Sequence, residues 1–425
     1  MKIMIVGLNY APEMVGIAVY TSGMAEVLQR DGHEVTVISG QPYFPSWKVF
    51  PGFSKYGYAA EGGAGAPEVI RCPHYVPEVP SGLRRILHYL SFSATALPVA
   101  LWRGLRNRPD VVFVVAPSLL SAPVGWIVAR LTGARTWLHI QDFEVEAAFA
   151  TGVLKESSAL GWLAKKFESR TLRAFGRVSS ISSAMLQKLR DKKVAEQRIY
   201  ELRNWANLSH ITPVEGRSPM RDELGIATPY MALYSGSIAN KQGIEILPEA
   251  AKLLAAREDF TMVICGEGPY LDEIKRRAEG LDNVRFFPLQ PLDKLSDLLG
   301  AADIHLLPQI ADAATLVLPS KLTNMLASGR PVIATVDPGT VLAEEIEDCG
   351  IAVAPGDAAA LARSIGMLLD NPALRERFGK AARTRAMRRW DGKQIINDLQ
   401  EELQSLLNED KKIPTPPRPT ALEQR

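Results

Sequence analysis

The chain is poor in cysteine and lacks the pattern of a secreted disulfide protein. Its 425 residues contain three cysteines, Cys72, Cys265 and Cys349, which are widely spaced, with no Cys-x-x-Cys pair and no histidine at zinc spacing. We expect them to be reduced thiols in the core, which indicates a cytoplasmic compartment. The start, MKIMIVGLNYAPE, has one lysine and a short apolar run, so it predicts a first β-strand rather than a signal peptide.

Three further signatures are absent, and each absence argues against a kind of site. No Gly-x-Gly-x-x-Gly motif follows the first strand, so the dinucleotide fingerprint is missing. No Asp-x-Asp motif occurs and the aspartates do not cluster as Mg²⁺ ligands, so we expect a site that works without a metal or another cofactor. No basic cluster alternates with stacking aromatic residues, so we expect no nucleic-acid partner.

The charge of the chain is divided unevenly between its halves, although the net charge is only +2. Residues 1–208 carry 24 Lys and Arg against 16 Asp and Glu, a net +8, whereas residues 209–425 carry 25 against 31, a net −6. One interpretation is chance variation of the surface. The other is that the first half meets an anionic surface or a pyrophosphate-bearing acceptor.

Short apolar runs typical of buried strands alternate with helical patterns along the chain. This alternation predicts an α/β protein, and the length suits two Rossmann-like domains with parallel sheets. We expect domains at 1–207 and 227–388, a linker at 208–226, a terminal helix at 389–410 and a disordered tail at 411–425. The expected strands are 2–6, 34–39, 110–116, 136–140, 178–181, 230–234, 260–265, 283–287, 302–307 and 331–335.

A polar turn, a helix start and a buried strand lie close together in residues 311–335. We expect Ser320 to cap a helix that runs to Ala327, since its hydroxyl can accept hydrogen bonds from the free N–H groups of the first turn. Gly329 ends this helix, and a short apolar strand follows. In an open parallel sheet, nucleotide ligands bind at such a turn, where helix amides face an anion or sugar hydroxyls.

The end of this stretch, Leu-Ala-Ser-Gly-Arg-Pro-Val-Ile at 326–333, resembles the donor-nucleotide signature of retaining glycosyltransferases of family GT4. The family's two glutamates are absent, since Asn324 holds the second position and Leu316 the one eight residues earlier. Asp312 is an alternative for the first, at a spacing of twelve from Asn324. The variant Pro-Ser-Lys-Leu-Thr-Asn at 319–324 resembles bacterial exopolysaccharide and O-antigen (lipopolysaccharide) transferases, including those of colanic acid assembly.

The resemblance implies a GT-B fold, in which two Rossmann-like domains face a crevice and a terminal helix returns to the first domain. After strand 230–234 the family carries Gly-Arg and then Lys-Gly. Here Ser237 holds the arginine position, and Lys241 remains to grip the donor diphosphate, the alternative being a solvated lysine.

Further donor contacts are implied on both domains. Gly16 would let the backbone approach the diphosphate, although a turn could equally require this glycine. Lys321 would contact phosphate, while Thr323 and Asn324 would hydrogen-bond the ribose in place of the missing glutamate. Gly268 lies in a tight turn that follows strand 260–265.

The end of strand 136–140 carries the candidate acceptor and catalytic residues of the first domain. Members of the family with this pattern place a His-Asp or Gln-Asp pair here, which Gln141 and Asp142 match, with His139 two residues before Gln141. Asp142 would orient the acceptor or face the positive charge that develops on the sugar, the alternative being a helix cap. His139 is a catalytic candidate or a packed core histidine.

Two segments of the first domain have open interpretations. Residues 41–80 are rich in proline, glycine and aromatic residues and lack strand periodicity, so we expect a long loop that either faces the acceptor or packs on the surface. Residues 83–105 predict a helix whose middle carries no full charge and whose ends carry arginines. It is either a core helix or an interfacial helix on anionic inner-leaflet lipid.

The function implied is transfer of a sugar from a nucleotide-diphosphate donor, GDP- or UDP-linked deoxyhexose or N-acetylhexosamine, to a polyprenyl-diphosphate-linked glycan. Two alternatives stay open: a nucleotide-sugar 2-epimerase of the same fold, and an inactive donor-binding partner, which the loss of both glutamates would explain. We expect a cytoplasmic protein, either free or peripheral on the inner face of the plasma membrane.

Overall fold

The computed structural model describes residues 1–14, 16–63, 65–150, 152–155, 157–206, 208–239, 242–310 and 318–409. The site candidates Lys241 and Asp312 and the expected tail 411–425 lie outside these residues. The chain forms two compact units. The first comprises Met1–Ser180, Leu189–Leu202 and Ile396–Arg425, and the second Ile181–Lys188 and Arg203–Ile395.

The described residues of the first unit form an eight-stranded sheet in the order β3-β4-β2-β1-β5-β6-β7-β8. All neighbours pair in parallel except β3 with β4. The parallel strands therefore end at one common edge. The bounds are β1 Lys2–Gly7, β2 Glu34–Gly40, β3 Ala59–Glu61, β4 Glu68–Cys72, β5 Val111–Ala116, β6 Arg135–Ile140, β7 Arg177–Ser180 and β8 Ile199–Glu201.

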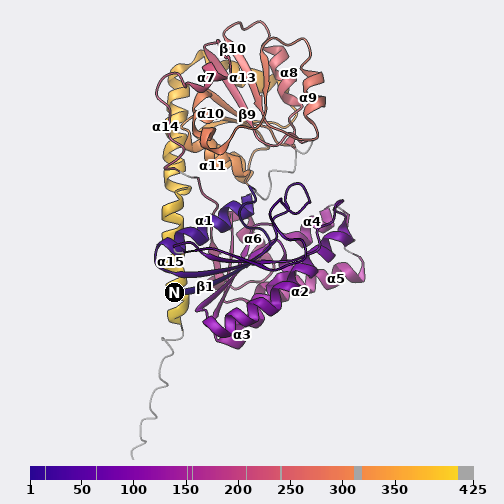
Figure 1. Ribbon diagram of the computed structural model, residues 1–425. Helices are drawn as coiled ribbons and strands as arrows, with labels where there is room; N and C mark the ends of the chain where they lie inside the picture. The colour runs from indigo at the N-terminus through magenta and orange to yellow at the C-terminus, as the bar shows by residue number, and fades with distance from the viewer. Residues whose placement is uncertain are drawn as a thin grey trace, which may run out of the picture. The chain divides into compact units, whose positions relative to one another are not determined.

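Helices cover this sheet, with α2 and α3 packed side by side against it (Figure 1). The middle strand β5 is apolar and buried at every position, as expected for a parallel strand covered on both faces. The helices are α1 Gly16–Arg30, α2 Gly82–Asn107, α3 Ala122–Thr132, α4 Glu144–Ala150, α5 Ala159–Ala174 and α6 Ser183–Asp191, the last of which contributes residues to both units.

The expectation of one long loop over residues 41–80 was wrong in part. β3 and β4 lie inside this range, and β4 pairs with β2 from Thr36 with Glu68 to Gly40 with Cys72. The side chain of Arg71 on β4 is buried and ion-paired with Glu61 on β3. A strand that carries a buried arginine in a five-residue run has no clear apolar alternation, which explains why it escaped the pattern.

The second unit contains a parallel sheet whose described strands lie in the order β11-β10-β9-β12-β13-β14. The strands are β9 Tyr230–Ser235, β10 Phe260–Cys265, β11 Val284–Phe287, β12 Ile304–Leu307, β13 Val332–Thr335 and β14 Gly350–Val353. The helices are α7 Met220–Glu223, α8 Ile246–Leu253, α9 Leu271–Arg277, α10 Leu295–Ala301, α11 Ser320–Ala327, α12 Val341–Ile346, α13 Ala358–Asp370 and α14 Pro372–Arg389.

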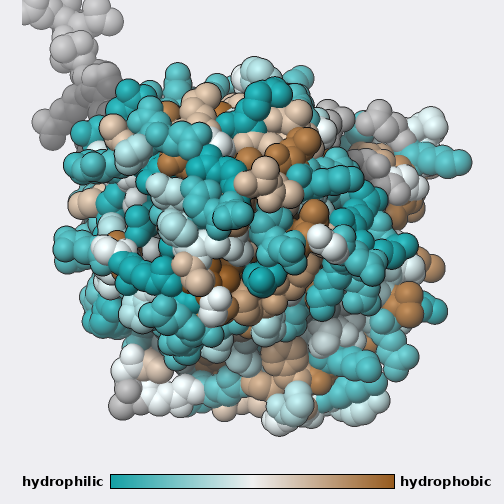
Figure 2. All heavy atoms as spheres, turned by 90° about the horizontal axis from the view of Figure 1, so that it is seen from above, coloured by the Kyte–Doolittle hydropathy of each residue, from teal (hydrophilic) through white to brown (hydrophobic). Residues whose placement is uncertain are grey.

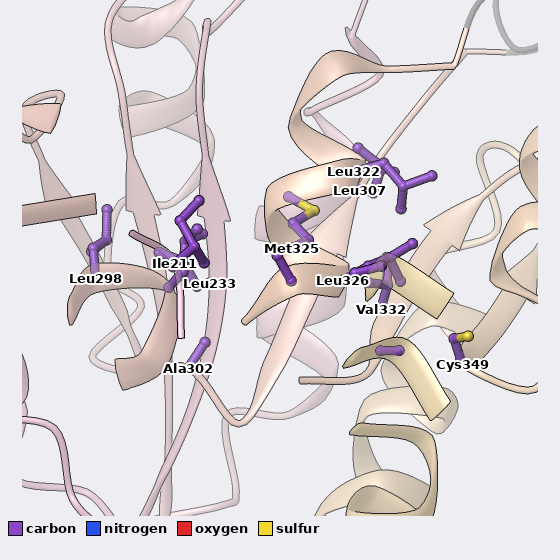
Figure 3. Packing of buried hydrophobic residues seen from close by; sticks show 14 of the residues in the cluster. Ile211, Leu233, Leu298, Ala302, Leu307, Leu322, Met325, Leu326, Val332 and Cys349 are labelled. Atoms are coloured by element: carbon purple, nitrogen blue, oxygen red, sulfur yellow. The ribbon is translucent and has the colours of Figure 1, made fainter. Parts of the chain in front are cut away.

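Apolar residues fill the interior, whereas the surface seen in Figure 2 is mainly hydrophilic with smaller apolar areas between. In the second unit one of the two core clusters joins α11 to the sheet. Figure 3 shows Met325 and Leu326 of α11 beside Val332 of β13 in this cluster. The face of α11 that these residues bury leaves Lys321 and Asn324 on its other side, both partly exposed.

The terminal helix α15, Gly392–Asn408, belongs to the first unit from Ile396 onward. It buries Ile396, Leu399, Leu403 and Leu406, a spacing of three and four residues that defines one helical face. Arg177 at the start of β7 donates to Glu402 at 2.6 Å and also pairs with Glu409. Apolar packing and a half-buried ion-pair cluster together hold the helix on this unit.

Shortening Leu403 should loosen α15 from the first unit. Leu403 is fully buried, so Leu403→Ala should remove packing and leave a cavity, lowering the free energy of unfolding by about 2–5 kcal/mol. Calorimetry would detect this as a lower midpoint of the transition to which the first unit contributes. The exposed neighbour Gln404, changed to Ala, is the control and should leave the midpoint in place. Equal midpoints for the two variants would show that α15 does not stabilise this unit.

Candidate functional site

The loop after β9 is held in one conformation by its own strand. The hydroxyl of Tyr234 donates to the carbonyl of Ser237 at 2.6 Å. The side chain of Ser237 is exposed, so this residue presents a hydroxyl to solvent at the carboxyl edge of the sheet. The predicted donor residue Ser237 therefore lies on a fixed turn, as a phosphate loop requires.

The adjacent turn after β10 packs against this loop and is hydrogen-bonded to it. The amide of Ile238 donates to the carbonyl of Glu267 at 2.8 Å. Gly268 has φ +154°, and a Cβ there would lie 2.1 Å from the carbonyl oxygen of Ile238. No other residue can occupy this position without moving the backbone. The structure thus places Gly268 against the Ser237 loop, where its absence of a side chain lets two loops meet.

Lys321 brings a buried amine to the same place. Its Nζ atom lies 4.2 Å from the centre of the Tyr234 ring, and a Cβ at Gly236 would lie 3.3 Å from it. Within the part of the chain that the structure describes, this buried Nζ has no hydrogen-bond partner. Burial lowers the pKa of Lys321 to about 8. A buried cation beside an aromatic ring, without a hydrogen-bond partner among the described residues, is a ready partner for an anion.

The two ribose candidates on α11 differ in accessibility. Thr323 is buried, and its hydroxyl donates to the carbonyl of Ser320 at 3.0 Å. Asn324 is partly exposed and follows Lys321 by three residues, so the two side chains share a face of the helix. Of the two, Asn324 is the one that can meet a sugar hydroxyl in this conformation. The expected cap by Ser320 is not formed, since Pro319 is the N-cap and no side chain caps this end.

Residues next to Lys241 also converge on this edge. Gly243 approaches the end of β12, where its Cβ would lie 2.9 Å from the carbonyl carbon of Gln309. Gln309 in turn donates its amide to Thr335 at the end of β13, at 2.7 Å. Gly243 thus lies against the carboxyl end of β12, which is itself bonded to the end of β13. Among the described residues, no three His, Cys, Asp or Glu side chains group as metal ligands.

In the first unit, the end of β6 separates a buried histidine from an exposed aspartate. His139 is buried, its Nδ1 lies 2.9 Å from the hydroxyl of Ser179, and burial lowers its pKa to about 3. Trp137 donates to the same hydroxyl at 2.8 Å. His139 is therefore a neutral ring in a core hydrogen-bond group. Asp142 is exposed at the carboxyl edge of the sheet.

Glu144 lies beside Asp142 and was not anticipated. One carboxyl oxygen accepts from the amide of Leu119 at 2.5 Å, and the other is buried without a hydrogen-bond partner among the described residues. Burial, with a smaller contribution from Asp142, raises the pKa of Glu144 to about 7. The sequence-based prediction covered the Gln-Asp pair but not Glu144. The acidic run Asp-Phe-Glu-Val-Glu after a strand was the signal that could have pointed to it.

The aromatic segment after β2 is anchored by a second buried carboxylate. Glu13 accepts from the amides of Tyr43 and Phe44, both at 2.8 Å, and from Asn9 at 2.8 Å. Gly16 follows as the first residue of α1, and among the described residues a Cβ there would contact the Tyr20 ring, at 3.8 Å.

Two buried histidines join the aromatic segment, and sequence reasoning missed both. The rings of His74 and His88 lie 4.9 Å apart and contact Tyr43 at 5.4 and 4.6 Å. Burial lowers the pKa of His74 to about 3 and of His88 to about 4, so both are neutral. Part of the 41–80 segment therefore packs inward, at the edge where β2 and β4 end.

Comparison with known proteins agrees with this architecture. Residues 15–205 match the family "Glycosyl transferase 4-like domain", and residues 217–385 match "Glycosyl transferases group 1". Sucrose-phosphate synthase from Thermosynechococcus elongatus has a similar structure, with a TM-score of 0.72 at 18% identity over 96% of this chain and 100% of that one. Anabaena HepE in complex with UDP gives 0.68 at 16% identity over 95% and 100%. The chain belongs to the GT4 glycosyltransferases with the GT-B fold.

Within this family the chain is 39% identical over 413 residues to the "Putative colanic acid biosynthesis glycosyl transferase WcaI" of Escherichia coli K12. The match covers 94% of this chain and the whole of that protein. The sequence-based expectation of a GT4 enzyme that resembles the colanic acid branch is confirmed.

Replacing Lys321 by methionine should act in opposite directions on the free and the nucleotide-bound protein. The change removes a buried amine without a hydrogen-bond partner, so the thermal midpoint of the free protein should rise. It also removes the charged contact that we expect with the donor phosphates, so the Kd for the preferred nucleoside diphosphate should increase about tenfold or more. Calorimetric titration and thermal unfolding measure the two effects. Lys252→Met, at an exposed lysine, should change neither.

Proton uptake provides a second readout of the same contact. With a pKa of about 8, Lys321 is largely neutral near ~pH 9 in the free protein, and a diphosphate favours its charged form. Nucleotide binding at ~pH 9 should therefore be accompanied by proton uptake in wild type, and by less uptake in Lys321→Met. Calorimetric titration in buffers of different ionisation enthalpy measures this uptake. Equal proton uptake by wild type and Lys321→Met would show that Lys321 does not contact the phosphates.

Glu144 should make stability depend on pH. Its folded pKa of about 7 exceeds the ordinary value of ~4.3, so the folded state binds the extra proton and this group destabilises the fold as pH rises between those values. The difference in thermal midpoint between Glu144→Gln and wild type should therefore increase in favour of the variant as pH rises through this range. Above the range the difference should stay constant. Glu78→Gln, at an exposed site, is the control. A difference that does not vary with pH would contradict the raised pKa.

Proposed function

We propose that this chain transfers a sugar, with retention of anomeric configuration, from a nucleoside-diphosphate donor to a lipid-linked glycan in exopolysaccharide or O-antigen assembly. The relation to the colanic acid branch supports the pathway class. The observation that carries the donor assignment is the buried Lys321 amine, which lies beside the Gly236 loop without a hydrogen-bond partner among the described residues. By the same relation, the donor sugar is a GDP- or UDP-linked deoxyhexose or N-acetylhexosamine.

The leaving diphosphate is stabilised by cations and backbone amides of the second unit. In the reaction an acceptor hydroxyl oxygen bonds to the anomeric carbon, the bond to the phosphate oxygen breaks, and the hydroxyl proton leaves with the diphosphate. Negative charge grows on the phosphate oxygen, and Lys321, with Lys241, meets it there. Since the sequence has no Asp-x-Asp motif, these lysines take the role that a divalent cation would otherwise have.

Asn324 completes the donor site from the same helix. It shares the accessible face of α11 with Lys321 and offers both a donor and an acceptor to ribose hydroxyls. Such an amide replaces the family glutamate without adding negative charge near the diphosphate. Thr323, with its hydroxyl on the Ser320 carbonyl, supports the helix turn instead.

The acceptor is held by the first unit. Asp142 is exposed at the carboxyl end of β6, where a carboxylate can orient an acceptor hydroxyl or face the positive charge of an oxocarbenium-like transition state. His139 acts behind it by fixing the strand end through Ser179, not as a proton carrier, because a pKa of about 3 keeps it neutral. A lipid-linked acceptor places the reaction at the inner face of the plasma membrane, with the enzyme peripheral on it. None of the described helices is long and apolar enough to cross a membrane.

A nucleotide screen followed by a transfer assay tests this function. One of GDP, UDP, ADP or dTDP should raise the thermal midpoint without magnesium, since a ligand at ~100 times its Kd stabilises the folded state by about 2.7 kcal/mol. With the matching nucleotide sugar, the free nucleoside diphosphate should be released only when a membrane extract or a synthetic polyprenyl-diphosphate glycan is present. Lys241→Ala should lower turnover about 10²-fold or more.

Each result has a clear contrary outcome. Release of nucleotide without acceptor would point to hydrolysis or epimerisation rather than transfer. Turnover of Lys241→Ala within a factor of ~3 of wild type would remove Lys241 from the leaving-group site. Donor binding with no turnover under any acceptor would support an inactive partner.

A further inference from the structure

The outward face of α2 is apolar along its whole length. Its exposed uncharged positions recur every three or four residues, so they lie on one side of the helix. The five large residues among them are between 45% and 71% exposed. We call these positions the α2 stripe: Leu83, Leu87, Leu90, Ala94, Pro98, Trp102 and Leu105.

The opposite face of α2 already supplies the contacts that folding needs. It buries Phe92, Ala96 and Ala100, and Gly104 packs so closely that a Cβ there would lie 2.6 Å from Val128 of α3. The α2 stripe is therefore not part of the core. An apolar stripe that spans some six turns in water is a sign of an interaction surface.

The charged residues on α2 itself are all basic, and one of them, Arg103, is ion-paired with Glu68 of β4. Neither α2 nor the neighbouring α3 contains an acidic residue. Arg84 and Arg85 lie at the start of α2, and Arg103 and Arg106 at its end. The Arg103 and Arg106 guanidinium groups lie 4.6 and 5.8 Å from the centre of the Trp102 ring. An indole with cations beside it is the arrangement favoured at the boundary between lipid headgroups and acyl chains.

A second apolar and basic group lies nearby on the same unit. Val153 is exposed, and one of its methyl carbons lies 2.4 Å from where a Cβ of Gly82 would be, which places it at the start of α2. On α5, which packs against α3, Trp162 is exposed with the Lys166 ammonium 4.5 Å from its ring. The pattern of exposed tryptophan and cation thus recurs beyond α2.

We propose that the α2 stripe docks on an anionic lipid bilayer, with α2 lying in the plane of the headgroups. Apolar side chains enter the acyl boundary, while the exposed Arg84, Arg85 and Arg106 meet lipid phosphates. A protein partner of mixed charge would be met by some acidic residue on α2, and there is none. The inference deepens the proposed function, because a lipid-linked acceptor has to be reached at this surface, but vesicle binding needs no donor or acceptor.

Vesicle sedimentation with the full chain tests the α2 stripe directly. The protein should pellet with vesicles of phosphatidylglycerol and phosphatidylcholine, and much less with phosphatidylcholine alone. Leu87→Glu with Leu90→Glu should lower the partition coefficient about tenfold or more, since both side chains would otherwise be buried in lipid. These residues are exposed, so the fold should be retained. The control is Leu253→Glu with Met367→Glu, two exposed apolar residues of the second unit, which should pellet as wild type.

The charged component has its own variant. Arg84→Ala with Arg106→Ala should reduce binding to anionic vesicles about tenfold at low salt and less at ~0.15 M salt, whereas Arg363→Ala should have no effect. Wild-type pelleting of the Leu87 and Leu90 variant would overturn the proposal. A second result would also overturn it: wild type does not bind vesicles but self-associates in gel filtration, and the Leu87 and Leu90 variant does not self-associate. The α2 stripe would then contact a second copy of the chain. Vesicle binding without acceptor-dependent nucleotide release would support the role of the α2 stripe and contradict the transferase function.

Discussion

Parallel strands covered by helices confine polar chemistry to one edge of a sheet. Both sheets of this protein have buried strands such as β5 and β10, where a free polar group would be costly. The loops after the strands carry what remains: Asp142 after β6 and Ser237 after β9. This constraint explains why the candidate residues of each unit gather at strand ends although they are far apart in the sequence.

Within the second unit, the loop beside Lys321 depends on close backbone contacts. Gly268 meets Ile238, and Tyr234 holds Ser237, so contacts within the unit fix the backbone of the proposed diphosphate site. The buried Lys321 amine is unfavourable in the free protein, because burial removes it from water and the Tyr234 ring replaces water only in part. In the donor site that we propose, a bound diphosphate would relieve that cost, so part of the affinity for the ligand would come from the unfavourable state of this amine in the free protein.

The sequence predicted most strands of both sheets and the family, because long apolar runs and the Gly-Arg-Pro-Val-Ile tail are local signals. It did not predict β4, whose buried Arg71 needs Glu61 of another strand as a partner. It could not rank Thr323 against Asn324, because which face of α11 is buried follows from packing on Val332 and its neighbours. Glu144 was missed since its raised pKa arises from burial in the folded chain, where it contacts Leu119, twenty-five residues earlier in the sequence.

Helix α2 shows why composition alone left two interpretations open. Apolar residues lie on both the inner and the outer face of this helix, so both the buried and the interfacial interpretation fitted residues 83–105. The structure shows that each reading describes one face: Phe92 and Ala96 pack inward, while Leu87 and Trp102 remain in solvent. A helix that only served the core would gain solubility from polar residues on its outer side. Retaining leucine and tryptophan there, with arginines at both ends, is physically favourable only where that side leaves water.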